Sequence, residues 1–168
     1  MSIIQVDTLQ KRDGSTFPVG KILNAYNVGY STQLAITSTA YTDFLSKTLT
    51  PVSSSSTFII QCSIHAWNQD SGQNSTWGIR CLRDSTAVYQ PSVLYEISSE
   101  NAVTSGHVRP AWSLSDSPSS SSQIVYKIQL STFNNADVTF NRGSYFRSDM
   151  TIFEVGAWVH LKLQIYKN

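Results

Sequence analysis

The sequence predicts an all-β fold, an antiparallel β-sandwich of the jelly-roll kind, on three observations. Apolar and polar residues alternate along most of the chain, most clearly at 57–67 and 123–131, which is the period of a strand with one buried face. No segment has convincing helical periodicity. Turn-forming Ser, Gly, Pro and Asn residues separate about ten short segments, a spacing typical of sandwiches and unlike a parallel sheet, which needs intervening helices.

The expected strands follow from this alternation. In the two clearest segments every second residue is apolar: Phe58, Ile60, Cys62, Ile64 and Ala66 in the first, and Ile124, Tyr126, Ile128 and Leu130 in the second. The other expected strands are 21–30, 32–37, 41–49, 77–83, 87–90, 107–114, 137–141, 150–155 and 158–166. The serine runs at 53–56 and 119–122 are too short to link domains, so we expect one sandwich domain over residues 21–168.

The first 20 residues are expected to form an extended anchoring arm, residues 1–20. They hold a brief apolar alternation followed by a turn, which is too little apolar surface to bury alone, so a partner should order them. The arm residues expected to dock on that partner are Ile4, Val6, Leu9 and Phe17.

An additional strand is expected at the C-terminal end, at 158–166. Every second residue on one of its faces is apolar: Val159, Leu161, Leu163 and Ile165. An apolar strand left bare at a sheet edge promotes aggregation. We therefore expect this strand to pair within an oligomer.

The composition favours association with proteins over binding to nucleic acid. Only 14% of the 168 residues are charged, and the net charge is +1 with no basic run longer than Lys11-Arg12. A nucleic-acid-binding surface needs a basic patch that neutralises phosphates. The N-terminus lacks a secretory pattern and no run of about 18 apolar residues occurs, so we expect neither secretion nor membrane insertion.

The two cysteines, Cys62 and Cys81, each lie in an apolar run, without the further Cys or His residues that a metal site requires. Buried free thiols are the favoured interpretation, because unpaired cysteine behaves as a small buried apolar residue. A disulfide is the alternative, and it needs Cα atoms that lie close together.

Patterns for catalysis and cofactors are missing from the sequence. His65, His107 and His160 lie on separate expected strands without metal-ligand spacing, although oligomer symmetry could bring copies of one histidine together. Glu96 and Glu100 are the only acids whose spacing pairs them, and we expect them to be solvated in a loop; carboxylates that converge from different loops are the alternative. We expect no cofactor, no metal and no enzymatic activity.

The aromatic residues exceed what one small core can hold. Some should therefore lie in a subunit interface, where Tyr, Phe and Trp are enriched. The interface candidates are Tyr126, Phe140, Tyr145 and Phe153, with Val159, Leu161, Leu163 and Ile165 of the last strand. Three tryptophans near loop-rich stretches are alternative candidates for stacking on sugar rings of a host-surface glycan: Trp67, Trp77 and Trp112.

Several short motifs in the expected order resemble structural proteins of marine tailed bacteriophages. They are SSSSTFII (53–60), GIRCLRDSTAV (78–88), SPSSSSQIVYKIQ (117–129), DVTFNRG (137–143) and MTIFEV (150–155), with VDTLQKRDG (6–14) resembling the leader of many of these proteins. The family's fold resembles the jelly roll of complement globular heads and tumour necrosis factors, which implies a homotrimer without catalysis. The strand at 158–166 and the lack of a shaft between arm and head depart from the family, and the second departure weakens a long-fibre interpretation.

These features predict a non-enzymatic bacteriophage virion structural protein, made in the host cytoplasm, that forms a homotrimer and docks on tail or capsid proteins through its arm. A tail fibre or host-contacting tip and a capsid decoration protein remain alternatives within that class. A carbohydrate-binding module is the alternative from another class. A jelly-roll lyase or hydrolase has the weakest support.

Overall fold

The chain forms thirteen strands in the computed structural model, which describes residues 21–68, 75–91, 95–97, 106–133, 138–143 and 145–156. The strands are β1 (Lys21–Tyr30), β2 (Leu34–Ile36), β3 (Thr42–Leu49), β4 (Thr57–Ser63), β5 (Ala66–Asn68), β6 (Ser75–Arg83), β7 (Thr86–Tyr89), β8 (Tyr95–Ile97), β9 (Gly106–Val108), β10 (Ala111–Asp116), β11 (Ile124–Phe133), β12 (Val138–Phe140) and β13 (Ser148–Gly156).

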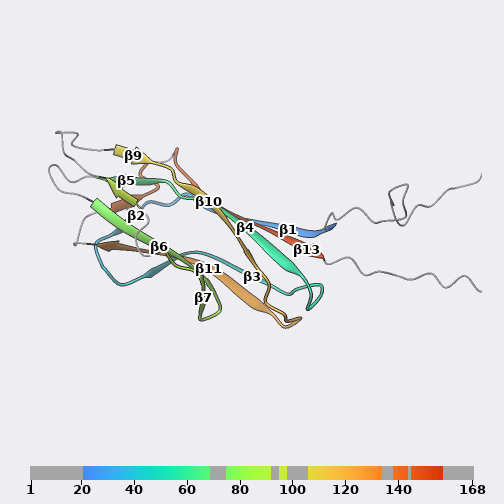
Figure 1. Cartoon of the computed structure of the whole chain (residues 1–168). Coiled ribbons are helices and arrows are strands. Elements are labelled where there is room, and N and C mark those ends of the chain that lie inside the picture. Colours follow the sequence, from blue (N-terminus) through green and yellow to red (C-terminus); the bar gives the residue numbers. More distant parts are fainter. Residues whose placement is uncertain are drawn as a thin grey trace, which may run out of the picture.

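The strands lie in two layers that stack face to face (Figure 1). The first layer consists of two sheets with matching orders of neighbours, β1-β13-β4-β10 and β2-β12-β5-β9. Because β1 runs on into β2, β4 into β5, β9 into β10 and β12 into β13, the two sheets form one long bent layer. The second layer has the order β3-β11-β6-β7, and β8 also pairs with β6.

The connections between the layers are those of a jelly roll. The chain crosses from one layer to the other after β2, β3, β5, β8, β10 and β11, and every described strand pair is antiparallel. As a result β13, the last described strand, lies between β1 and β4 in the first layer. The all-β antiparallel jelly roll predicted from the sequence is confirmed.

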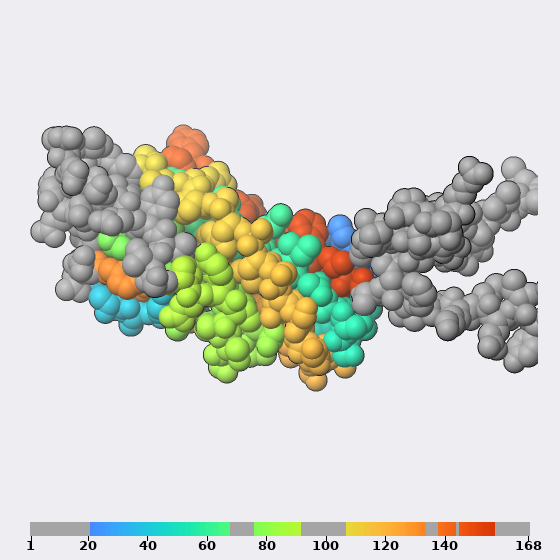
Figure 2. All heavy atoms as spheres, in the orientation of Figure 1, coloured from blue at the N-terminus to red at the C-terminus, as the bar shows by residue number. Residues whose placement is uncertain are grey.

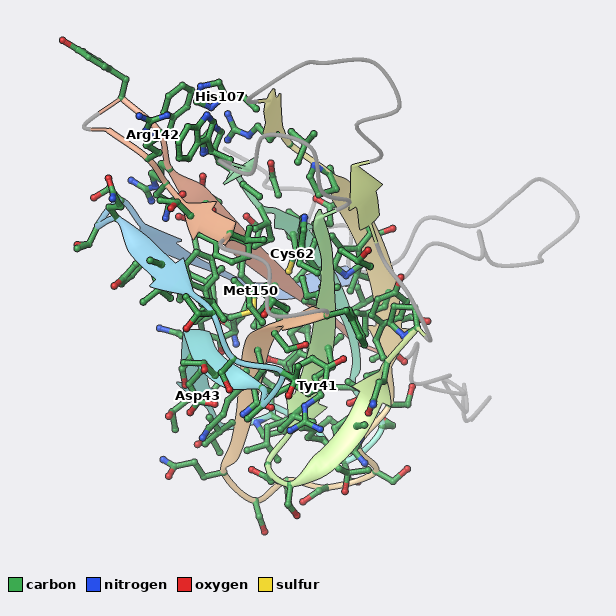
Figure 3. All side chains as sticks on the ribbon, turned by 90° about the vertical axis from the view of Figure 1, so that its left-hand side faces the viewer. Tyr41, Asp43, Cys62, His107, Arg142 and Met150 are labelled. Atoms are coloured by element: carbon green, nitrogen blue, oxygen red, sulfur yellow. The ribbon has the colours of Figure 1, made fainter. Side chains whose placement is uncertain are left out.

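The core lies between the layers and takes the inward half of each alternating strand. In β4 the side chains of Phe58, Ile60 and Cys62 are buried, whereas those between them are exposed. Tyr126 of β11 packs on Phe58 with ring centroids 5.6 Å apart, and Met150 lies opposite Cys62 between the layers (Figure 3). The alternation at 57–67 and 123–131 therefore identified the inward faces of two central strands.

The first layer bends where two neighbouring strands are interrupted at facing positions. Ile64 and His65 separate β4 from β5, and Arg109 and Pro110 separate β9 from β10. The amide of Ile64 donates to the carbonyl of Pro110 at 3.0 Å, and Pro110 has no N–H with which to continue the ladder. The single strand expected at 57–67 is therefore divided into β4 and β5, and the one expected at 107–114 into β9 and β10.

One expected loop contains a strand. Glu96 belongs to β8 and pairs opposite Thr76 of β6, although sequence alternation had given no strand there. Glu100, its expected solvated neighbour, lies outside the described residues.

Both expected terminal elements, the arm at 1–20 and the strand at 158–166, lie outside the described residues. Lys21 pairs with Gly156 at the end of β1 and β13, so the chain enters and leaves the sandwich at the same end (Figure 1). Within the described ranges, no helix is long and apolar enough to cross a membrane.

Candidate functional site

The outward surface of the first layer, which we call the outer face, changes character along its strands. It consists of the side chains of β1, β13, β4 and β10 that point away from the core, continued by those of β5 and β9. Near β5 and β9 it is aromatic and basic, in the middle it is polar, and near Lys21 and Gly156 it is apolar.

The outward surface of the second layer is occupied by interlocked polar side chains. Asp43 accepts hydrogen bonds from Lys127, at 2.9 Å, and from Gln129. Arg80 donates to Gln129 at 2.6 Å, and its guanidinium carbon lies 4.2 Å from the ring centroid of Tyr41. Because these groups already have partners, the outer face is the better candidate for a functional surface.

The loop between β12 and β13, of which residues 141–143 and 145–147 are described, projects from the outer face; its orange-red atoms protrude at the top of Figure 2. The buried Asn141 holds the base of the loop. Its backbone N–H donates to the carbonyl of His65 at 3.1 Å, and its side-chain Nδ2 donates to the carbonyl of Tyr30 at 2.8 Å. Ser148 Oγ donates to Asn141 Oδ1 at 2.8 Å and accepts from the amide of His65 at 2.9 Å. Asn141 and Gly143 have φ values of 53° and 85°, which asparagine and glycine tolerate.

Two histidines meet beneath this loop. His65 Nε2 lies 3.1 Å from His107 Nδ1, and the ring of Phe146 stacks on His65 with centroids 3.8 Å apart and an interplanar angle of 9°. Phe146 also stacks on His107, at 4.9 Å. The sequence places His65 and His107 on separate expected strands and does not predict this contact. It arises because β5 pairs with β9, which sets Trp67 opposite His107 and brings His65 alongside.

The surroundings of His65 determine which of its ring nitrogens carries the proton. His65 is only 2% exposed, and its Nδ1 has no hydrogen-bond partner among the described residues. A buried bare acceptor is tolerated better than a buried unpaired N–H, so we assign the proton to Nε2, which donates to His107. His107 is exposed and then carries its own proton on Nε2. Burial, followed by the neighbouring His107 and Arg109, lowers the pKa of His65.

Three arginines lie on the loop between β12 and β13 or close to the histidine pair. The guanidinium carbon of Arg142 lies 3.3 Å from the ring centroid of Trp67, and Figure 3 shows Arg142 and His107 at the same end of the sandwich. Arg147 forms an ion pair with Asp149 at 2.6 Å, whereas Arg109 lies 3.9 Å from the same carboxylate. Among the described residues Arg142 makes no ion pair, and the described side chains at this end of the outer face include more cationic than anionic groups.

A shallow groove of about 460 Å³ crosses the middle of the outer face. Arg109 donates to Ser63 Oγ at its edge, at 2.9 Å, and Thr151 Oγ1 accepts from Asn27 at 2.9 Å. The groove is lined by Gln61, Cys62, Ser63, Ala111, Trp112, Ser113, Asp149 and Thr151. Its floor therefore combines hydroxyl, amide and carboxylate groups with the apolar surface of residues such as Ala111 and Trp112.

The third part of the outer face is the apolar end, composed of Ile22, Ile59, Phe153 and Val155. Phe153 pairs opposite Ile59, and Val155 pairs opposite Ile22. Ile22 is 58% exposed and Ile59 is 37% exposed. Large apolar side chains are thus gathered beside the point where the chain enters and leaves the sandwich.

The interface candidates from the sequence separate into core and surface. Tyr126 and Phe140 have no exposed area and pack between the layers, so their assignment to an interface is corrected. Phe153 is partly exposed in the apolar end, and Tyr145 is 94% exposed in the loop between β12 and β13. The remaining candidates, Val159, Leu161, Leu163 and Ile165, and the arm residues Ile4, Val6, Leu9 and Phe17, lie outside the described residues.

The three tryptophans suggested for sugar stacking are all covered to some degree. Trp77 is buried and meets Phe140 edge-on at 5.3 Å, so it has no surface for a ligand. Arg142 lies on one face of Trp67, and Trp112 stacks on Tyr89 at 6.3 Å. Trp112 nevertheless lines the groove.

The cysteines are buried and free, as predicted. Burial raises the pKa of Cys62, and burial together with Asp116 raises that of Cys81 to about 12. In the ranges that the structure describes, no group of three or more His, Cys, Asp or Glu side chains could hold a metal ion.

The residues that sequence reasoning missed are those of the loop between β12 and β13. Arg142 appears in the sequence only as part of the DVTFNRG motif, and no functional role was predicted for it or for Phe146. The pairing of His65 with His107 had a usable signal, because in a jelly roll the strand pair β4–β5 lies beside β9–β10. The position of the loop over the outer face had no such signal.

Solved structures of virus particles share the fold. The chain is similar to one in the structure of infectious bursal disease virus Gx strain, with a TM-score of 0.51 and 13% identity over 90% of this chain and 37% of that chain. A chain of the T13 particle of the same virus has a TM-score of 0.46 and 12% identity over 92% of this chain and 40% of that one. The VP2 subviral particle gives a TM-score of 0.45 and 12% identity over 92% and 42%.

The similarity to the chain of the Gx strain, at 13% identity, shows the fold alone, which is a jelly roll. This chain spans about two fifths of the length of the chains it matches. No protein-family model and no curated protein matches it.

Proposed function

We propose that the chain is a non-enzymatic structural protein of a bacteriophage virion, a jelly-roll building block that assembles with copies of itself. The observation that supports this most is the fold likeness to a chain of a virus particle, which extends over 90% of this chain. The motifs between residues 53 and 155 that resemble structural proteins of marine tailed bacteriophages support the same class.

The roles of the buried carboxylates support a structural function. Glu154 is fully buried and accepts from the amide of Val52 at 2.6 Å, from Ser56 Oγ at 2.7 Å and from Asn24 Nδ2 at 3.0 Å. Asp116 accepts from Arg83 Nη1 at 2.7 Å and from the Tyr126 hydroxyl at 2.6 Å, and so joins the two layers. Both acids hold strands and loops together, which is the work of a scaffold rather than of a general acid or base.

The apolar end supports assembly into an oligomer. Its residues lie where the arm and the C-terminal segment join the sandwich, and an exposed apolar patch rimmed by polar residues is typical of a protein contact. We propose a homotrimer in which this end, with Val159, Leu161, Leu163 and Ile165, contacts neighbouring copies. Residues 1–20 would then dock on another virion protein.

Two locations in the virion fit this proposal: the chain is a tail fibre or host-contacting tip, or it is a capsid decoration protein. Gold-labelled antibody against the chain, applied to purified particles, distinguishes them by the part of the particle that it decorates. Decoration of tail tips supports the first and decoration of heads supports the second. Unlabelled particles, with the chain missing from their protein composition, would contradict both.

A further inference from the structure

We infer that the outer face binds an anionic saccharide, a glycan bearing sulfate or carboxylate groups, through Arg142, His107 and Arg109 and the groove beside them. This site is additional to the proposed structural role and does not depend on where in a virion the chain is located. The groups that carry the inference lie on β5, β9 and β10 and on the loop between β12 and β13.

Arg142 is arranged to receive an anion. Its guanidinium carbon lies 3.3 Å from the centroid of the Trp67 ring, and the indole therefore removes water from one face of the cation. Arg142 is exposed and forms no ion pair within the described residues. The N–H groups at the edge of a stacked guanidinium match the paired oxygens of a sulfate or carboxylate.

His107 adds a second donor next to the same ring. Its ring centroid lies 6.4 Å from that of Trp67, and its Nδ1 is engaged by His65. The remaining Nε2–H is therefore available to a ligand, and the stacked Phe146 ring restricts the orientation of the imidazole.

Among the described residues, arginines outnumber carboxylates around the loop. Arg147 is the close partner of Asp149, at 2.6 Å, whereas Arg142 lies against Trp67 and has no ion pair within the described chain. Arg109 reaches Asp149 only at 3.9 Å, and its side chain is 57% exposed. An anionic ligand would supply the missing negative charge.

The groove supplies groups that recognise sugar hydroxyls. Gln61 and Ser113 are exposed on its floor, and neither side chain has a hydrogen-bond partner within the described residues. The volume of about 460 Å³ falls in the range of small-ligand sites, about 300–1,000 Å³. An amide and a hydroxyl can each donate and accept, as sugar hydroxyls require.

A saccharide fits the cationic residues and the neighbouring groove better than a nucleic acid does. Nucleic-acid binding needs a row of cations along the backbone, and the net charge of the whole chain is only +1. The outer face instead sets a few cationic donors beside uncharged hydroxyl and amide groups. That pattern suits a polymer with sparse negative charge and many hydroxyls.

Calorimetric titration of the full chain at low salt tests the inference with four probes. They are a sulfated oligosaccharide, a uronate oligosaccharide of the same length, a neutral oligosaccharide of that length, and inorganic sulfate alone. The site is supported if the sulfated or the uronate oligosaccharide binds while the neutral oligosaccharide and inorganic sulfate bind more weakly or not at all. The charged oligosaccharide that binds more tightly then identifies the anionic group. Equal binding of the neutral sugar, equal binding of inorganic sulfate, or no binding at all would overturn it.

Arg142→Ala and its matched control, Arg80→Ala, test the location. Both arginines stack on an aromatic ring and both substitutions remove one positive charge, but Arg80 lies on the second layer. Loss of a charge-assisted hydrogen bond should weaken binding about tenfold for Arg142→Ala, while Arg80→Ala changes it little. Gln61→Ala, in the groove, should weaken binding of the oligosaccharide and leave the melting temperature unchanged. Equal losses for the two arginine variants would show a charge effect only and would overturn the assigned site.

Discussion

His65 and His107 are 42 residues apart in the sequence and share a hydrogen bond of 3.1 Å between neighbouring strands of the first layer. Phe146 covers both rings from the loop between β12 and β13. The Phe146 ring and the imidazole pair thus link β9, and the junction of β4 with β5, to the loop that projects from the layer.

The first prediction concerns pH. The folded chain holds the pKa of His65 below its ordinary value of 6.5, chiefly through burial, so the unfolded chain binds the proton more readily. The free energy of unfolding should be unaffected by this group above about pH 7 and should fall as the pH drops below 6.5, until the lower folded pKa is reached. Urea unfolding measured between pH 5 and pH 8, a range of about three units around the histidine pKa, checks this.

Two variants separate the histidines. His65→Gln keeps an N–H donor for His107 but does not titrate, so the dependence assigned to His65 should disappear. His107→Asn should retain most of that dependence, because burial is the largest cause of the shift at His65. An unchanged pH profile in His65→Gln would contradict the assignment.

Phe146 should stabilise the fold, and its neighbour Tyr145 should not. Phe146→Ala removes the ring that stacks on both histidines and should lower the free energy of unfolding by about 1–2 kcal/mol. Tyr145→Ala is the matched control, because that ring is 94% exposed and should contribute within about 0.5 kcal/mol. Chemical denaturation of the two variants provides the comparison, and equal losses would show that the stack contributes nothing specific.

Glu154 should contribute far more to stability than a surface carboxylate. Glu154→Ala leaves the backbone N–H of Val52, the hydroxyl of Ser56 and the side-chain amide of Asn24 without their buried acceptor. The free energy of unfolding should fall by about 3 kcal/mol or more. Asp43→Ala removes an exposed carboxylate paired with Lys127, and the expected loss is below about 1 kcal/mol. If thermal denaturation gave similar losses, Glu154 would not be holding the 51–56 loop to β13.

The thiols of Cys62 and Cys81 should resist modification in the folded chain. Both are buried, and burial is the main reason that the pKa of Cys81 is raised to about 12, so little thiolate forms at neutral pH. A thiol reagent should react with neither residue until denaturant is added. Rapid reaction with the native chain would contradict the buried assignment.

The apolar end and the segment at 158–166 should act together in assembly. A chain ending at Gly156, and the single variant Leu161→Asp, should lose oligomer stability, since each fully buried aliphatic side chain contributes about 1.5–3 kcal/mol. Ile59→Asp should have a similar effect, whereas Gln61→Asp, on the same face of β4, should not. Light scattering checks the mass, and an unchanged oligomer in the first three variants would show that this end is not an interface.

How far the sequence predicts the structure depends on whether a feature is local. The alternation in 57–67 identified Phe58, Ile60 and Cys62 as one buried face because strand period is a property of consecutive residues. The same reasoning could not decide between core and interface for Tyr126 and Phe140, since both environments take aromatic residues. Their complete burial follows from the stacking of two layers, which no single strand encodes.

The candidate site was less predictable because it is assembled from distant segments. Trp67, His107 and Arg142 meet only through the pairing of β5 with β9 and the path of the loop after β12. Register between strands far apart in the sequence depends on the whole fold. The break at Pro110, in contrast, could have been predicted, since proline interrupts a ladder wherever its missing N–H would be needed.

The proposal of a virion building block can be tested by reconstructing the virus particle that contains this chain, at a resolution that separates strands. We expect two-layered jelly-roll density in threefold-related copies, with the end at Lys21 and Gly156 directed toward neighbouring copies and residues 1–20 against another virion protein. A particle without the chain, or a chain attached as a single copy through the outer face of its first layer, would contradict the account.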